Sequence, residues 1–140
     1  MITLLKCDKI TVVIKMIGND WDEVLYSVWN SDGFHKFMNN VKKEYEKNIG
    51  NQDYVIAMDI DGKIHNSEEL AELIDSTFNH HSTITFIIGS SYGLHQDIKD
   101  KANLRMSFSK LTFPHGLFRG ILLEQIYRSF KILNNESYHK

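Results

Sequence analysis

The chain has 140 residues, a formal net charge of −2 and 42% hydrophobic residues. This length predicts one domain that buries roughly two thirds of its unfolded surface. The apolar content and the single proline exclude disordered and collagen-like chains. Cys7 is the only cysteine, so we expect no disulfide framework and no cysteine-based zinc site. No apolar run reaches the roughly 18 residues of a membrane span, and we expect a cytosolic protein.

Charge is unevenly distributed along the chain. Residues 99–140 hold eight basic and three acidic residues and carry +5, whereas residues 1–98 carry −7. Such a basic segment is suited to facing phosphate groups on an otherwise acidic protein. Judged by charge alone, a chance distribution of surface charges explains this asymmetry as well as a phosphate-facing patch does.

The first fifty residues predict two strands and two helices. A β-branched run at Ile10–Met16 predicts a strand, and residues 2–5 predict another. Apolar residues near the 3.6 period predict a short helix over residues 20–29 and a longer one over residues 34–48.

The middle of the chain alternates strands with helices, which is the pattern of a layered α/β fold. Residues 54–60 (YVIAMDI) predict a buried strand that a turn at Asp61 and Gly62 closes. Asn66 followed by Glu69 forms a capping-box pattern and predicts a helix up to residue 78.

The remaining elements follow the same alternation. TITFII at Thr83–Ile88 predicts a strand, residues 96–102 a helix and residues 105–108 a short strand. A last helix is predicted over residues 117–133, before a polar tail. Its predicted inner stripe consists of Leu117, Ile121, Leu122, Ile126, Phe130 and Leu133.

The loop after the strand at Thr83–Ile88 contains Gly89 and Gly93. Two glycines at this spacing match neither the dinucleotide fingerprint nor the phosphate-binding P-loop. Two interpretations of this loop remain open. It is either a tight turn that needs a positive φ, or a ligand-binding loop other than these two nucleotide-binding types.

Other site patterns are weaker. The seven histidines have no metal-ligand spacing, and we predict no metal site. Asp59 and Asp61 flank the predicted turn, where turn aspartates are the favoured interpretation. The serines beside Gly89 lack the Gly-x-Ser-x-Gly pattern of a hydrolase nucleophile.

Six ordered segments over residues 53–140 resemble one known family. They are VIAMDIDGK (55–63), SEEL (67–70), FIIGSSYGL (86–94), SFSKLTFPH (107–115), LLEQIYRSFKI (122–132) and the terminal YHK (138–140). Together they are similar to the ribosomal RNA large-subunit methyltransferase H family, which is of the SPOUT class.

The resemblance implies an α/β fold with a SPOUT-type sheet flanked by helices and a deep trefoil knot near the C-terminus. It also implies a homodimer that uses S-adenosylmethionine. The implied reaction is methylation of N3 of a pseudouridine in large-subunit (23S) rRNA of assembled ribosomes.

The same motif match implies two sets of site residues. Those implied to contact S-adenosylmethionine are Met58, Gly89, Phe108, Ser109, Lys110, Leu111, Thr112 and Phe113. Arg128 is implied to steady negative charge on the base, His139 to relay a proton, and Tyr138 to stack on or hydrogen-bond the base. A surface ion pair between Arg128 and Glu124 and a frayed tail are the alternatives for these residues.

The sequence departs from the family at its beginning. Within a single predicted domain, the N-terminal part (about residues 1–50) is shortened or divergent, and Ser90 stands where a second glycine is common. The alternative function is therefore a cofactor-binding protein that is inactive, retargeted to tRNA or another rRNA base, or partnered with a full-length homologue.

Overall fold

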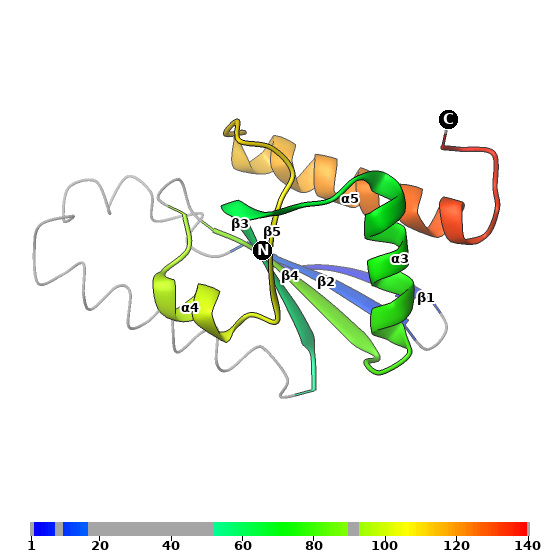
Figure 1. Ribbon diagram of the computed structural model, residues 1–140, viewed down its shortest axis with the longest axis horizontal. Helices are drawn as coiled ribbons and strands as arrows, with labels where there is room; N and C mark the ends of the chain where they lie inside the picture. Colours follow the sequence, from blue (N-terminus) through cyan, green and yellow to red (C-terminus); the bar gives the residue numbers. More distant parts are fainter. Residues whose placement is uncertain (1, 8–9, 17–51, 90–92, 140) are drawn as a thin grey trace, which may run out of the picture.

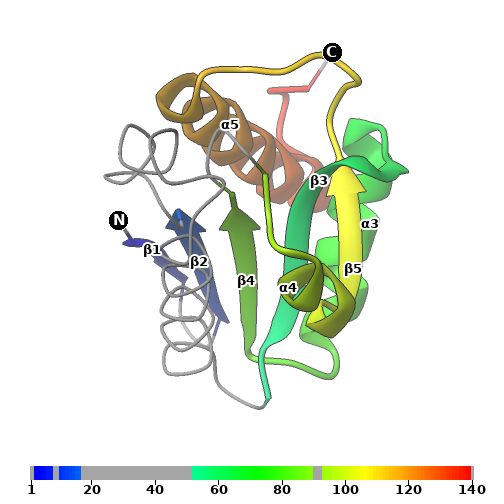
Figure 2. The same ribbon diagram turned by 90° about the vertical axis from the view of Figure 1, so that its left-hand side faces the viewer.

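A sheet with the strand order β1-β2-β4-β3-β5 forms the centre of the computed structural model, which describes residues 2–7, 10–16, 52–89 and 93–139 (Figure 2). β1 (Ile2–Cys7) and β2 (Ile10–Met16) are antiparallel. β2, β4 (Thr83–Ile88), β3 (Tyr54–Ile64) and β5 (Leu104–Ser107) are mutually parallel. The helices predicted over residues 20–29 and 34–48 lie outside the described residues.

Helices cover both faces of this sheet (Figure 1). α3 (Ser67–Phe78) and α5 (His115–Leu133) lie on one face, and α4 (Gln96–Lys101) lies on the other. Successive side chains of β3 pack on opposite faces of the sheet, as expected for a strand that is buried on both sides. Ile56 belongs to the core cluster under α3 and α5, whereas Ala57 belongs to the cluster under α4. The predicted α/β layer architecture is confirmed.

The predicted turn at Asp61 and Gly62 is wrong, because β3 continues through both residues to Ile64. Met58 and Lys63 both pair with Met106 of β5, so residues 59–62 leave the ladder with β5 between these two pairs. A Cβ atom on Gly62 would lie 2.6 Å from the backbone nitrogen of Met106. The glycine therefore permits a close approach of two strands instead of forming a turn.

The capping box predicted for α3 is confirmed. The side chain of Asn66 accepts a hydrogen bond from the backbone nitrogen of Glu69 at 2.8 Å. The Glu69 carboxylate accepts one from the backbone nitrogen of Asn66, also at 2.8 Å. These bonds satisfy amide donors that the first turn of a helix leaves unpaired.

α5 begins at His115, two residues before its predicted start, with Pro114 as its N-cap residue. Leu122 and Ile126 are fully buried in the core, as predicted. Leu117 is 57% exposed, so its placement on the inner stripe is wrong. α3 packs beside the later turns of α5, and the first turn extends past it (Figure 1).

The smaller predicted elements shift by single residues. α4 ends at Lys101, one residue before its predicted end, and β5 begins and ends one residue earlier than predicted. Within the described residues, none of the helices combines the length and the apolar character needed to cross a bilayer.

Candidate functional site

A cavity of about 730 Å³ opens where the parallel strands end. Its walls come from residues 58–61 of β3, the end of β4, Gly89, residues 93–94 and the segment 108–114, which runs from β5 to α5 (Figure 2). Ligands of parallel α/β sheets commonly bind beyond the carboxyl ends of the strands. The lining residues are Met58, Asp59, Ile60, Asp61, Ile88, Gly89, Gly93, Leu94, Lys99, Met106, Ser107, Phe108, Ser109, Leu111, Thr112, Phe113, Pro114 and Phe118.

The two glycines at this cavity serve different purposes. Gly93 has a φ of 81°, so the interpretation that the loop needs a positive φ is confirmed at this residue. At Gly89, a Cβ atom would lie 2.6 Å from the carbonyl carbon of Gly93 and 2.9 Å from the nitrogen of Leu94. Gly89 therefore lets two backbone segments meet beside the cavity.

The segment 108–114 is held by its own hydrogen bonds and by aromatic contacts. The Ser107 hydroxyl donates to the carbonyl oxygen of Ser109 at 2.9 Å, and the Ser109 hydroxyl accepts from the nitrogen of Leu111 at 3.0 Å. The ring of Phe118 on α5 lies 5.5 Å from that of Phe108 and 6.2 Å from that of Phe113, centroid to centroid. Leu111 is 72% exposed and leaves apolar surface at the rim.

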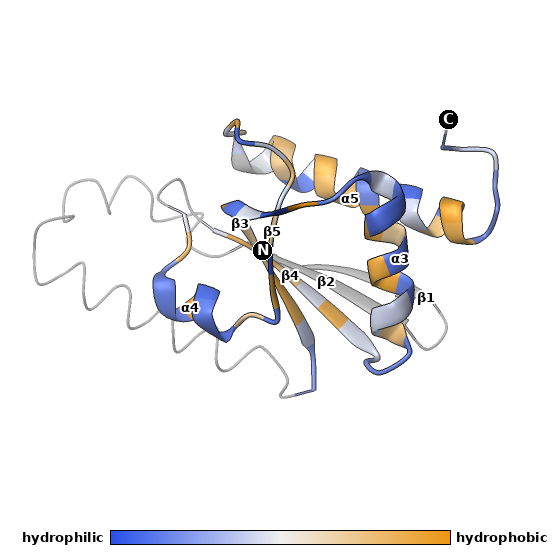
Figure 3. Ribbon diagram, viewed as in Figure 1, coloured by the Kyte–Doolittle hydropathy of each residue, from blue (hydrophilic) through white to orange (hydrophobic). Residues whose placement is uncertain are grey.

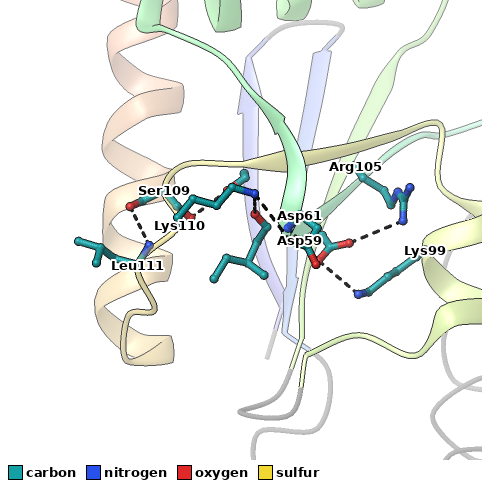
Figure 4. Close-up of polar contacts among 9 residues, drawn as sticks. Asp59, Asp61, Lys99, Arg105, Ser109, Lys110 and Leu111 are labelled. Atoms are coloured by element: carbon teal, nitrogen blue, oxygen red, sulfur yellow. Dashed lines mark hydrogen bonds and ion pairs between the residues drawn. The ribbon is translucent and has the colours of Figure 1, made fainter.

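Seven of the eight residues that the motif match assigned to the cofactor line this cavity, and Lys110 does not. The Lys110 ammonium instead donates to the carbonyl oxygen of Ile60 at 2.9 Å and lies 3.7 Å from the Asp61 carboxylate (Figure 4). The Lys110 side chain therefore pairs with β3 instead of lining the cavity.

A charged wall beside α4 was missed by sequence reasoning. The Asp59 carboxylate lies 3.2 Å from the Lys99 ammonium and 3.9 Å from the Arg105 guanidinium (Figure 4). The Asp59 carboxylate also accepts a hydrogen bond from the backbone nitrogen of Asp61 at 3.4 Å, the local contact of a turn aspartate, although β3 continues through this position. The available signal was the charged residue Asp59 directly after the apolar run of residues 54–58. Within the described residues, no three His, Cys, Asp or Glu side chains converge as metal ligands.

Arg128, Tyr138 and His139 form a second cluster, and none of them lines the cavity. The Arg128 guanidinium donates to Glu124 at 2.5 Å and to Nδ1 of His139 at 3.1 Å. The Tyr138 hydroxyl donates to Glu124 at 3.1 Å. The alternative prediction of an ion pair between Arg128 and Glu124 is thus confirmed. His139 and Tyr138 also bond to this pair, so the described part of the tail packs against α5 and is not frayed.

Glu68, at the start of α3, completes this C-terminal cluster. Its carboxylate lies 2.7 Å from Nε2 of His139. Because a guanidinium only donates, Nδ1 of His139 is an acceptor toward Arg128, and Nε2 carries the hydrogen that Glu68 accepts. Sequence reasoning missed Glu68, because an acidic residue in a first helical turn has an ordinary role there.

Hydrogen bonds shift the proton affinities of the cluster. The Arg128 guanidinium lowers the pKa of Glu124, and the His139 ring lowers the pKa of Glu68. The hydrogen bond to Glu124 raises the pKa of both Tyr138 and Arg128. Tyr138 is therefore a hydrogen-bond donor at neutral pH, and Glu124 is an acceptor.

Comparison with known proteins decides the family. Residues 13–139 match the family described as "Predicted SPOUT methyltransferase". The chain belongs to the SPOUT methyltransferase family. It is 50% identical over 107 residues to the ribosomal RNA large subunit methyltransferase H of Clostridium botulinum strain Hall, covering 72% of this chain and 67% of that protein. It is 52% identical over 95 residues to the putative ribosomal RNA large subunit methyltransferase H of Methanococcus vannielii, covering 67% and 60%.

SPOUT methyltransferases use S-adenosylmethionine. The cavity suits this cofactor, because its volume of about 730 Å³ lies within the usual range for small-ligand sites. Apolar Met58 and Phe113 stand beside the hydroxyl groups of Ser109 and Thr112. A mostly apolar wall with a few polar groups is the composition expected for a nucleoside-containing ligand.

Proposed function

We propose that this protein transfers a methyl group from S-adenosylmethionine to N3 of a pseudouridine in large-subunit rRNA of the assembled ribosome. The observation that carries the proposal is that Met58, Gly89 and the segment 108–113, which are distant in sequence, meet at one cavity. The relatives named above supply the substrate class. Action on ribosomes would place the protein in the cytoplasm.

The cavity residues would bind and orient the methyl donor. Met58, Leu111 and Phe113 would enclose the adenine, and backbone groups at Gly89 and in the segment 108–113 would hydrogen-bond its edge. When bound, the donor supplies an electrophilic methyl group on a sulfonium. Holding that methyl group in line with the attacking nitrogen is the main contribution that such a site makes to the rate.

The C-terminal cluster would act on the base. Arg128 would steady the negative charge that develops when N3 loses its proton, because a guanidinium donates hydrogen bonds to an oxygen anion. Glu124 holds Arg128 in place and also accepts the single hydroxyl hydrogen of Tyr138, whose ring would stack on the base. His139 would take up this proton at Nδ1, in place of the hydrogen bond from Arg128, while its Nε2 hydrogen passes to the Glu68 carboxylate.

We further propose that the protein is a homodimer in which the cluster of one subunit serves the cavity of the other. The support is that Arg128, Tyr138 and His139 line no part of the cavity of their own chain. Leu117 and Tyr127, both on α5, are 57% and 50% exposed, and apolar residues occur along this helix (Figure 3). Sedimentation of wild-type protein and of Leu117→Lys tests this, with a dimer expected only for the wild type.

We also propose the deep trefoil knot that the family implies. β5 lies on the far side of β3 from β4, and the segment 108–114 then returns over the ends of both strands to α5. This return is the passage in which the chain would thread its own loop. A continuous crystallographic trace through residues 83–133 tests the threading, and an unthreaded trace would reject it.

Methyl transfer into ribosomes tests the proposed function. Ribosomes that lack the methyl mark are incubated with the protein and isotopically labelled S-adenosylmethionine, and the modified nucleotide is located by mass spectrometry. The expected product is a pseudouridine labelled at N3 in large-subunit rRNA, with Arg128→Ala as the low-turnover control. Label in tRNA or at another rRNA base would support a retargeted enzyme, and donor binding without any transfer would support the inactive alternative.

A further inference from the structure

Lys99 extends from α4 to Asp59 in β3 and lines the cavity. Its side chain is only 20% exposed, and the ammonium is fixed 3.2 Å from Oδ1 of Asp59 (Figure 4). A long cationic side chain that is mostly buried and held in one position is unusual at a surface, because lysine ammonium groups strongly prefer water.

Lys99, Arg105 and Asp59 together carry a net charge of +1, whereas the cavity lining itself holds the carboxylates of Asp59 and Asp61 beside Lys99. The Asp59 carboxylate, whose side chain is 5% exposed, lies between two cations, Lys99 and Arg105. The neighbouring pair of Lys110 and Asp61 is neutral. Within the described cavity wall, Lys99 is the one basic side chain, and its ammonium has two further hydrogens to donate.

S-adenosylmethionine carries one group that matches this cation. Its sulfonium and its ammonium are positive and would be repelled by Lys99, whereas the carboxylate at its methionyl end is negative and accepts charge-assisted hydrogen bonds. We propose that Lys99 binds the carboxylate of the methyl donor and so selects a donor with an intact amino-acid end. This inference rests on the proposed function, because it requires the cavity to be the donor site.

Comparison of two donors tests this role without relying on turnover. Calorimetry gives Kd for S-adenosylmethionine and for decarboxylated S-adenosylmethionine, which lacks only the carboxylate. The wild type is expected to bind the intact donor about tenfold to a hundredfold more tightly, the range for one or two charge-assisted hydrogen bonds. In Lys99→Met this preference is expected to fall to within about twofold, while affinity for the decarboxylated donor stays the same.

Lys101→Met is the matched control, since Lys101 is on the same helix and does not line the cavity. It is expected to keep the wild-type preference. If Lys99→Met folds poorly, the two donors are compared in Lys99→Gln instead. Its amide retains a hydrogen-bonding group toward Asp59. Thermal melting establishes which variants are folded.

Two results would overturn the inference while leaving the proposed function standing. One is equal loss of affinity for both donors in the Lys99 variants, which would mean a structural role. The other is an unchanged donor preference together with weaker binding to ribosomes, which would mean that Lys99 contacts rRNA phosphate. Failure of the wild type to bind either donor would instead reject the proposed function.

Discussion

Gly89→Ala is the sharpest perturbation of the cavity. Its new methyl group would lie 2.6 Å and 2.7 Å from the carbonyl carbon and oxygen of Gly93, and 2.9 Å from the nitrogen of Leu94. All three are backbone atoms, so no side-chain rotation can relieve the contact. Restoring an ordinary separation of 3.4 Å requires a backbone shift of about 0.8 Å. Overpacking of this kind costs about 1–3 kcal/mol.

The shift would fall on the wall that holds the methyl donor. Misplacing one or two backbone hydrogen bonds corresponds to about tenfold to a hundredfold weaker binding of S-adenosylmethionine. Gly89→Val, with a branched side chain, should abolish binding.

Calorimetric titration with S-adenosylmethionine, accompanied by thermal melting, measures both effects. Gly120→Ala on α5 is the matched control, because a Cβ atom there meets nothing within 4 Å. It should bind the donor as the wild type does. Wild-type affinity in a folded Gly89→Ala variant would refute the assignment of this glycine to the donor site.

Three further predictions concern the tail, α3 and acid stability. Deletion of His139 and Lys140 should spare donor binding and lower turnover on ribosomes by about 10²-fold, and unchanged turnover would remove the tail from the mechanism. Asn66→Ala should lower the free energy of unfolding in urea by about 1 kcal/mol through loss of the cap, whereas an unchanged midpoint would contradict this. The hydrogen bond from Arg128 lowers the pKa of Glu124 from its ordinary value of 4.5. The ionised Glu124 side chain therefore stabilises the fold fully above pH 4.5, and this stabilisation is lost as pH falls through the lowered pKa of the folded state. Glu124→Gln should therefore flatten the acid-side loss of stability in urea unfolding, and a curve parallel to the wild type would contradict it.

Local patterns predicted those elements whose signals are local. The cap of α3 depends on Asn66 and Glu69 alone, and it forms as predicted. The strand at Thr83–Ile88 was identified from its β-branched and apolar run. Tertiary contacts explain why two other predictions, the turn at Gly62 and the burial of Leu117, were wrong. β3 runs through Gly62 because that glycine lies against β5, and Leu117 is exposed because α5 extends past its neighbour.

The candidate site was predictable only through resemblance. Nothing in periodicity brings Met58, Gly89 and the segment 108–113 together, because the strand order does so. Lys99 and Glu68 are two of the groups that resemblance did not supply. Both are charged residues on helices, where a solvated surface role is the ordinary expectation. Their positions, one in the cavity wall and one against His139, follow from tertiary structure alone.

The most direct test of the central claim is a crystal structure of the protein with S-adenosylhomocysteine, the product left after methyl transfer. We predict that the adenine lies between Met58, Leu111 and Phe113, with backbone contacts at Gly89 and in the segment 108–113. A complex in which the molecule is bound elsewhere, or a protein that takes up none of it, would contradict this assignment of the cavity.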